Sequence, residues 1–522
     1  MRRTLILLLI AFLFGGCLSL EKSTSSLTAL HSPEKLKSDA DFIYGKLQKL
    51  HPCLDNYTSK KELDFKFDSL KLSITSPMTS NEFFFRLSPV IAAIRQGHTR
   101  VSPINKKLSV KHEINPGMPG TLQFFQYDFE MFDNRFYITK NIGGHKDIKP
   151  PSELVSVNNH TPQEILRKYR NTLTSDGFNQ TFIERRLSKD LPSYLYYEDG
   201  LADSVVCELR YRDTLLRVCL RRNTKYRAPK VAISRAQRVE ERFARKKENS
   251  KREEQGYNEI TRTYSKNLSF PVPDSSIAIL KINDFSDGNH QKFYRETFRL
   301  LDTLKTKTLI LDIRDNPGGE LRDAADLFSY LTDTSFVFID KSEVASKASL
   351  FYANFFKGNP LIINIIISLA YPMEMVIRGV QVLMVTKDGD GRYLFPFPES
   401  TKSNCKNIHF KGKEYVLING GTFSAACILA SNLKGSKRAF FVGEETGGDY
   451  NGTVAGRMAT FTLPESRLKV TFGLAHVQPC YKTGMTGHGI FPDVRIRPTL
   501  EDRRQGVDPE MEYVLKKVTG DK

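Results

Sequence analysis

Two apolar runs separated by a helical pattern constrain the fold of this chain most. Residues 276–282 and 308–313 are rich in Ile, Leu and other apolar residues, and they bracket residues 291–305, where apolar residues recur at helical intervals. Strands that are apolar at nearly every position are typical of parallel sheets covered on both faces. The order strand, helix, strand therefore predicts a βαβ unit in an α/β domain built around a buried sheet.

A third apolar run, residues 416–418, leads into a glycine pair and then into Ser424, which precedes an apolar helical stretch. Glycine lets the backbone turn sharply, and a serine in the first turn of a helix lies where free N–H groups favour a developing oxyanion. The pattern predicts a strand-to-helix turn with Ser424 as candidate nucleophile. Taken alone, an ordinary helix N-cap is the better explanation of this serine.

Three further sequence blocks favour the nucleophile over the ordinary N-cap as the role of Ser424. They are residues 309–319 (LILDIRDNPGG), 442–448 (VGEETGG) and 487–493 (GHGIFPD). With the Ser424 block, their order and approximate spacing resemble the signature blocks of the C-terminal processing (tail-specific) proteases and the related tricorn core proteases, which are serine peptidases. The resemblance extends over roughly residues 40–500. It implies an α/β (α+β multidomain) fold with a ClpP/crotonase-like βαβ catalytic core, an N-terminal helical domain and an inserted PDZ-like β module.

The resemblance also implies the parts of an acyl-transfer site. Ser424 would be the nucleophile, and the N–H of Ala425 with the backbone at Gly318 or Gly319 would bind the oxyanion. Tail-specific proteases carry a lysine base in the turn after the Thr-Gly-Gly block, but this chain has Asp449 there. A Ser/Lys dyad is therefore not expected.

The tricorn-like branch instead uses a histidine in a Gly-His-Thr-like context, which residues 97–99 match, so His98 is the candidate base. Histidine titrates near neutrality and can accept the serine proton. A lone histidine at a helix end is more often structural, and the matching context is what favours His98. His488 is a rival base, ranked lower because its block resembles a structural turn of the family.

Two orienting residues of the tricorn tetrad are absent. The serine before the histidine is Gly97 here, and the glutamate before the late Gly-x-Gly is Thr486. Glu444 and Glu445 are nearby candidates to orient His98, with Glu445 preferred, although a turn-stabilising carboxylate is the more ordinary role. The resemblance implies no metal and no organic cofactor.

The N-terminus has the pattern of an export signal. A basic start, an apolar run over residues 5–14 and Gly15-Gly16-Cys17 resemble a bacterial lipobox, although Phe14 replaces the usual leucine. We expect residues 1–17 to be a lipoprotein signal peptide, Cys17 to be lipidated, and the mature chain to be anchored to a cell-envelope membrane, facing the periplasm or the cell surface. Simple secretion with an incidental Cys17 is the alternative.

The length of 522 residues suggests two to four domains. The expected order is a tether over 18–38, an N-terminal helical domain over 39–113, a PDZ-like domain over 114–222, a basic linker or helix over 223–270 and a serine peptidase core over 271–515. A Thr-Ser-Asn-Glu capping box at residues 79–82 predicts a helix start. Residues 153–166 are similar to the strand, turn and helix with which PDZ modules bind a peptide C-terminus, and a PDZ-like spacer without peptide capture is the alternative.

The formal net charge of +18 is concentrated between residues 221 and 252, which hold 13 Lys or Arg against three Glu. The segment contains no aromatic-interleaved platform for base stacking, so nucleic acid is not an expected partner. A solvated linker is favoured, with contact to anionic lipid headgroups as a second interpretation.

Six cysteines follow Cys17, and their spacing forms no CxxC pair and no metal-ligand pattern, so a zinc site is not expected. Cys207 and Cys219 flank a predicted hairpin turn at residues 211–214 and could lie on neighbouring strands.

Together these patterns predict an exported serine endopeptidase that cleaves unfolded or C-terminally exposed polypeptides through an acyl-enzyme on Ser424. Two alternatives stay open. One is a catalytically impaired peptide-binding protein that keeps the fold, and the other is an acyl hydrolase or esterase that uses the same serine.

Overall fold

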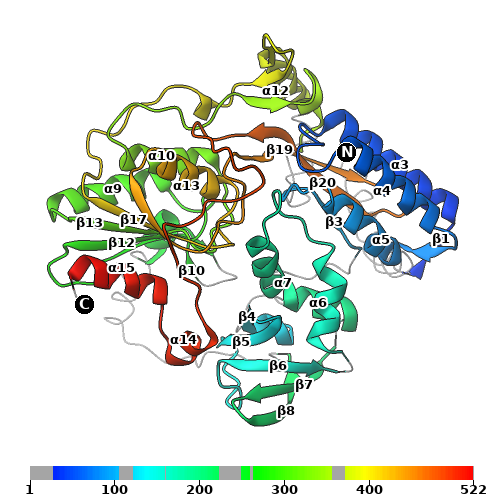
Figure 1. Ribbon diagram of the computed structural model, residues 1–522, viewed down its shortest axis with the longest axis horizontal. Coiled ribbons are helices and arrows are strands. Elements are labelled where there is room, and N and C mark those ends of the chain that lie inside the picture. The colour runs from blue at the N-terminus through cyan, green and yellow to red at the C-terminus, as the bar shows by residue number, and fades with distance from the viewer. Residues whose placement is uncertain are drawn as a thin grey trace, which may run out of the picture.

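The computed structural model describes residues 28–104, 121–158, 160–200, 202–222, 248–258, 263–354 and 371–520. The expectations for the signal peptide, for Cys17 and for most of the basic segment lie outside these residues. Three larger sheets organise the described chain, and Figure 1 shows the N-terminal helices, the module with β4–β8 and the C-terminal core as three neighbouring parts.

The core sheet has six strands in the order β11-β12-β13-β17-β18-β21. Its strands are β11 (Lys266–Ser269), β12 (Ile277–Ile282), β13 (Thr308–Asp312), β17 (Lys413–Ile418), β18 (Ala439–Gly443) and β21 (Val494–Arg495). The strands from β12 to β21 are parallel, and β11 adds an antiparallel edge. Helix α9 (His290–Thr303) joins β12 to β13, which confirms the predicted βαβ unit.

Helices cover both faces of this sheet, as its apolar strands predicted. Leu309 and Leu311 belong to a large buried cluster with residues of α9, α10 (Leu321–Leu331) and α13 (Ala425–Gly435). Ile310, on the opposite face of the same strand, is buried with Val514 of α15 (Pro509–Thr519). Figure 1 shows α15 on one side of the strands and the other three helices on the opposite side.

A second sheet joins the core to the N-terminal segment. Its order is β15-β16-β14-β20-β19, with β3 paired to β20. The strands are β3 (Arg100–Ser102), β14 (Ser342–Val344), β15 (Thr386–Lys387), β16 (Tyr393–Phe395), β19 (Thr453–Thr462) and β20 (Lys469–Val477). Because Val101 of β3 pairs with Val470 of β20, the backbone directly after His98 is fixed against the core.

The N-terminal part is helical, as expected, but it begins earlier than the sequence suggested. Its elements are β1 (Leu30–His31), α3 (Pro33–Leu50), α4 (Lys60–Ser73), β2 (Met78–Thr79) and α5 (Ser80–Ala92). The capping box is confirmed, since Thr79 and Glu82 each accept the other's backbone N–H at the start of α5. The tether expected up to residue 38 is wrong at its end, because Pro33 occupies the first turn of α3 and Leu36 is already buried in the core.

The module contains a five-stranded antiparallel sheet and its own buried cluster. Its elements are β4 (Tyr127–Phe132), β5 (Arg135–Asn141), β6 (Ser152–Val157), α6 (Pro162–Arg170), α7 (Thr181–Asp199), β7 (Ser204–Tyr211) and β8 (Thr214–Arg221). The predicted hairpin is confirmed by the pairing of Tyr211 with Thr214. Cys207 is buried and Cys219 is exposed, and both thiols are free.

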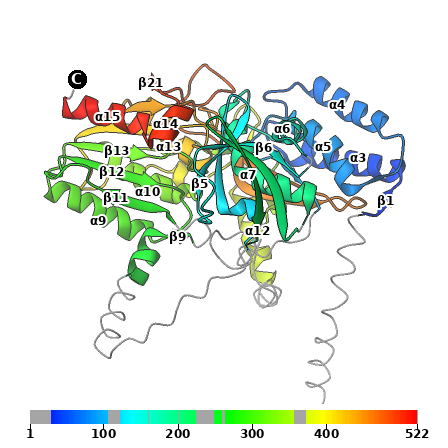
Figure 2. The same cartoon turned by 90° about the horizontal axis from the view of Figure 1, so that it is seen from below.

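The remaining described elements are short or lie at the periphery. They are η1 (Gln123–Gln126), β9 (Tyr257–Asn258), β10 (Thr263–Tyr264), η2 (Ser349–Tyr352), α12 (Tyr371–Met384), η3 (Pro398–Ser400) and α14 (Leu500–Gln505). In Figure 2, α15 and α14 lie on the side of the core opposite to α9. Among the described residues, no helix combines the length and the apolar character needed to cross a bilayer.

Candidate active site

Ser424 lies at the N-cap of α13, directly after the turn that follows β17. Its backbone has φ 55° and ψ −126°, a conformation that residues with a Cβ rarely adopt. The side chain is half-buried, and the helix that follows is buried along nearly its whole length. Such strain persists only where the surrounding structure holds it, and it is frequent at functional residues.

Hydrogen bonds hold this turn against the turn that follows β13. The side-chain oxygen Oδ1 of Asn419 accepts the N–H groups of Gly421 and Asp315, each at 2.9 Å. The N–H of Phe423 donates to the Asn316 carbonyl at 2.9 Å. Two segments about a hundred residues apart in sequence thereby form one rigid unit under Ser424.

Gly318 lies in van der Waals contact with Ser424, the candidate nucleophile. A Cβ at this position would lie 2.6 Å from Ser424 Cβ and 2.8 Å from the nitrogen of Ala425, and φ is +97°. The Gly318 N–H is used within its own turn, where it donates to Asn316 Oδ1 at 2.9 Å. No described residue accepts a hydrogen bond from the N–H groups of Gly319 and Ala425, so both remain candidates to bind an oxyanion.

His98 lies between α5 and β3 and reaches the Ser424 turn through Phe423. The two rings stack with centroids 4.7 Å apart, and His98 Nδ1 lies 3.2 Å from Thr453 Oγ1 at the start of β19. Burial, with a smaller contribution from the charge of Arg100, lowers the pKa of His98 to about 4. At neutral pH the imidazole is therefore uncharged, which is the form that can accept a proton. Among the described residues no hydrogen bond joins His98 to Ser424.

Asp176 is a buried carboxyl group behind His98 that the sequence patterns did not reveal. Its Oδ1 accepts the Gly97 N–H at 2.7 Å. Burial raises the pKa of Asp176 to about 7, and hydrogen bonding from Gly97 and from the Thr453 side chain opposes that shift. The Thr453 hydroxyl thus lies between His98 and Asp176. Neither Thr453 nor Asp176 belongs to a recognisable motif, so only the fold brings them to the histidine.

The glycine that replaces the tetrad serine has a steric explanation. A Cβ on Gly97 would lie 2.7 Å from Cζ of the Phe423 ring and 3.2 Å from Asp176 Oδ1. A serine side chain therefore has no space at position 97 while Phe423 stacks on His98. Thr486, at the position of the tetrad glutamate, is exposed.

The two glutamates proposed to orient His98 have other partners. Glu445 Oε1 accepts the Gly489 N–H at 2.9 Å and lies 3.3 Å from His488 Nδ1. Glu444 pairs with Arg185 of α7 at 3.1 Å. Both carboxylates therefore stabilise turns and the contact with α7, and no described hydrogen bond connects either one to His98.

Asp449 occupies the position of the tail-specific lysine and has a structural role. Its Oδ2 accepts the Tyr57 hydroxyl at 2.7 Å and the Gly487 N–H at 2.6 Å, while Oδ1 accepts the Asn451 N–H at 2.7 Å. The carboxyl is 2 % exposed. It joins the N-terminal turn at Tyr57 to two loops of the core.

A cleft of about 1300 Å³ opens beside the two turns. Its walls come from the N-terminal segment, the module and the core, and include His98, Phe423, Pro317, Arg185, Tyr194 and Arg503. Strand β4 contributes every one of its residues to the wall. Because β4 is an edge strand of the module sheet, its outer backbone edge faces no further strand of that sheet.

Comparisons with known proteins agree with this architecture. Residues 276–496 match the family model for peptidase family S41. The solved structure of mature CPAF complexed with lactacystin has a TM-score of 0.60 at 15% identity, over 93% of this chain and 98% of that one. Mature CPAF alone has a TM-score of 0.59 at 14% identity, over 94% and 98%.

No curated protein sequence matches the chain significantly. At these identities the CPAF structures establish the shared fold, while the family model covers the strands and turns that carry Ser424, Gly318 and Gly319. Residues 276–496 therefore form a domain of peptidase family S41, and the chain is a serine-type peptidase.

Proposed function

We propose that the chain is a serine endopeptidase that cleaves polypeptide segments through an acyl-enzyme on Ser424. Ser424 supports this proposal by its position. It is a strained residue at the start of a buried helix, in contact with Gly318 and beside a large cleft. A strand-to-helix turn of this kind exposes a hydroxyl while free N–H groups face the same point.

In the proposed reaction, Ser424 Oγ attacks the peptide carbonyl carbon as His98 Nε2 takes the hydroxyl proton. The N–H groups of Gly319 and Ala425 stabilise the negative charge on the carbonyl oxygen. His98 then returns the proton to the leaving nitrogen, the C–N bond breaks, and the amine product departs. A water molecule attacks the ester with His98 again as base, which releases the acid product and restores Ser424.

The orienting role belongs to Thr453 and Asp176 in this proposal. If Nδ1 of His98 carries the hydrogen and donates to Thr453 Oγ1, Nε2 keeps its lone pair for the serine proton. Thr453 can then donate its own hydrogen to Asp176. Because the described His98 ring is stacked on Phe423, we infer that substrate binding shifts Phe423 and brings Nε2 to Ser424.

The cleft suggests how a substrate is held. An unfolded or C-terminally exposed segment could add as a strand to the free edge of β4, with its backbone paired and its side chains in the cleft. This mode requires an extended substrate and favours denatured chains over folded domains. The basic and acidic side chains around β4, such as Arg503 paired with Glu130 at 3.0 Å, would border that strand.

The test uses a soluble form of the protein that starts after Cys17. This protein is labelled covalently with a fluorophosphonate, and its intact mass is then measured. We expect a single adduct that is absent in Ser424→Ala and strongly reduced in His98→Ala, since loss of a general base costs about two to four orders of magnitude in rate. His488→Ala is the matched control and should label at the wild-type rate. Absence of an adduct in the wild type, despite an open cleft, would contradict the proposal.

Peptide-binding and cleavage assays on the same variants separate the alternatives. Peptide binding that survives Ser424→Ala without any turnover would support a peptide-binding role. Ester cleavage without peptide cleavage would support an acyl hydrolase.

We further propose that the substrate is encountered outside the cytoplasm, on the basis of the export signal and Cys17 in the sequence. Metabolic labelling with a fatty acid analogue should mark the wild-type chain and not Cys17→Ser. Secretion of an unlabelled wild-type chain would favour simple export.

A further inference from the structure

Three side chains from distant parts of the chain meet on the second sheet, and none of the three lines the cleft. Cys53 lies in the turn after α3, Glu343 on β14 and His476 on β20. Glu343 and His476 are directly paired across the two antiparallel strands. Cys53 Sγ lies 3.4 Å from His476 Nδ1, and the ligand atoms of all three residues lie within 4.8 Å of one another.

This geometry is close to that of a metal site. Zinc binds thiolate sulfur at about 2.3 Å and imidazole nitrogen at about 2.0–2.1 Å, which separates sulfur from nitrogen by about 3.6 Å on a tetrahedral ion. The observed 3.4 Å differs little from that separation. The carboxylate of Glu343 supplies a third donor, and small side-chain rotations close the remaining gap.

The Glu343 carboxylate is the feature of this cluster that favours a cation, and it is opposed by the positive charges of Arg392 and Lys482 nearby. Glu343 is partly buried, and no ion pair within 4 Å is formed by it among the described residues, although the charge of Arg392 acts on it from further away. Without a metal, the Cys53 thiol would hydrogen-bond to His476 or to Glu343, and Arg392 would supply the positive charge that acts on this carboxylate from a longer distance. A divalent ion that accepts thiolate, imidazole and carboxylate together would neutralise the group.

The backbone at Cys53 is also unusual. Its φ of 53° lies in the left-handed region, which a residue with a Cβ rarely occupies. The turn is held further along by Tyr57, which donates to Asp449 at 2.7 Å, and by Thr58, which donates to the Ala93 carbonyl at 2.6 Å. The Cys53 side chain is thereby directed to the sheet that also carries Thr453.

We propose that Cys53, Glu343 and His476 bind a zinc ion, which fastens the turn after α3 to β14 and β20. The site is structural, because none of its three ligands is among the residues that line the cleft. It does not depend on the proposed peptidase activity. The wide separation of the ligands in sequence explains why cysteine spacing alone did not predict it.

The test is zinc binding by the full chain, purified without a polyhistidine tag, reduced, and equilibrated with zinc chloride against a chromophoric chelator. We expect about one zinc per chain by elemental analysis. Cys53→Ser and Glu343→Gln should weaken binding at least about 100-fold, beyond the 10–100-fold effect of an outer-shell partner. Cys480→Ser, which removes a half-exposed cysteine elsewhere, should bind as the wild type does.

Cobalt substitution and thermal unfolding provide independent readouts. Cobalt should give a thiolate charge-transfer band in the wild type that Cys53→Ser lacks, and zinc should raise the unfolding temperature of the wild type only. If Cys53→Ser does not fold, Glu343→Gln still allows zinc binding to be measured in a folded ligand variant. Failure of the wild type to retain zinc, or equal zinc binding by all variants, would overturn the proposal and leave a thiol–imidazole hydrogen bond.

Discussion

The strained backbone of Ser424 has a measurable consequence. A residue with a Cβ at φ 55° and ψ −126° is disfavoured by about 1–3 kcal/mol, and glycine escapes this cost although it loses more chain entropy on folding. Ser424→Gly should therefore be at least as stable as Ser424→Ala in chemical denaturation, while both fail to label with a fluorophosphonate. A Ser424→Gly variant less stable than Ser424→Ala by about 1 kcal/mol would show that the turn is not strained.

The pKa values of His98 and Asp176 predict the pH dependence of labelling. Only neutral His98 can act as base, so the rate should fall as pH drops through about 4, the pKa set by burial and by Arg100. Asp176, whose pKa burial raises to about 7, becomes charged near neutrality and should then stabilise protonated His98 through Thr453. We therefore expect a second rise in rate near pH 7.

Asp176→Asn should remove the rise in labelling rate near pH 7 and keep the fall in rate below about pH 4. Asp190→Asn, which alters another carboxyl group of the cleft wall, is the control and should keep both. A single transition near the ordinary histidine pKa of about 6.5, identical in all three proteins, would contradict the orienting role of Asp176.

At the scale of elements, Arg314 fastens the end of β13 to the start of α15. Its guanidinium donates to both carboxylate oxygens of Asp312 at 2.9 Å and to those of Asp508, the N-cap of α15, at 2.7 and 2.8 Å. Although burial alone would raise it, hydrogen bonds and charge from Arg314, with help from Lys281, lower the pKa of Asp312 to about 2. The Asp312 carboxylate thus stays charged although it is buried, and its charge is compensated mainly by Arg314.

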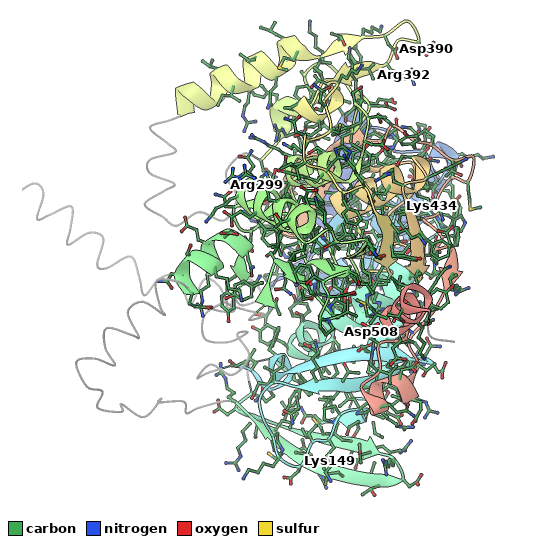
Figure 3. The ribbon with its side chains drawn as sticks, turned by 90° about the vertical axis from the view of Figure 1, so that its left-hand side faces the viewer. Lys149, Arg299, Asp390, Arg392, Lys434 and Asp508 are labelled. Atoms are coloured by element: carbon green, nitrogen blue, oxygen red, sulfur yellow. The ribbon has the colours of Figure 1, made fainter. Side chains whose placement is uncertain are left out.

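Arg314→Ala should lower the free energy of unfolding by about 3–5 kcal/mol at neutral pH, because it leaves the Asp312 carboxylate buried without its main partner. The difference in unfolding free energy between Arg314→Ala and the wild type should shrink as pH falls from about 4 towards 2. In this range Asp312 becomes protonated in the wild type as well, so its ion pair with Arg314 is lost. Arg392→Ala is the control. Figure 3 shows Arg392 beside Asp390 at the far end of the molecule from Lys149, and its exposed pairs should contribute nothing measurable. Equal stability of Arg314→Ala and wild type would refute this assignment.

At the scale of the whole molecule, the N-terminal helices and the core share one hydrophobic interior. A single buried cluster runs from Leu36 of α3 to Val101 of β3 and on into the core sheet, and β3 completes the second sheet. The module has a separate cluster. The N-terminal helical domain expected over residues 39–113 therefore shares its hydrophobic core with the peptidase domain expected over residues 271–515, whereas the module has a core of its own.

A chain that lacks residues 28–104 should consequently fail to fold. Removal of these residues exposes one side of the shared cluster and an edge of β20, which favours aggregation. Size-exclusion chromatography and circular dichroism should show an aggregated or non-cooperative species, whereas the full chain unfolds cooperatively. A soluble truncated chain with a sharp unfolding transition would show that the core is autonomous.

The local features of this protein were predictable from its amino-acid sequence. The apolar strands around residues 276–313 predicted the parallel sheet, and the Gly-Gly turn before Ser424 predicted the strand-to-helix connection, because both depend on residues that are neighbours in the chain. The capping box at Thr79 was predictable for the same reason. Each pattern reflects backbone preferences that act over a few residues.

Contacts between side chains that are distant in the sequence became visible only in the folded protein. Asp176 and Thr453 lie close to His98 because a loop of the module and the start of β19 meet there. Glu445 contacts His488 because both belong to neighbouring turns of the core. Cys53, Glu343 and His476 likewise come together through strand pairing and one strained turn. Such contacts depend on how sheets and loops pack across hundreds of residues, and no local spacing encodes that packing.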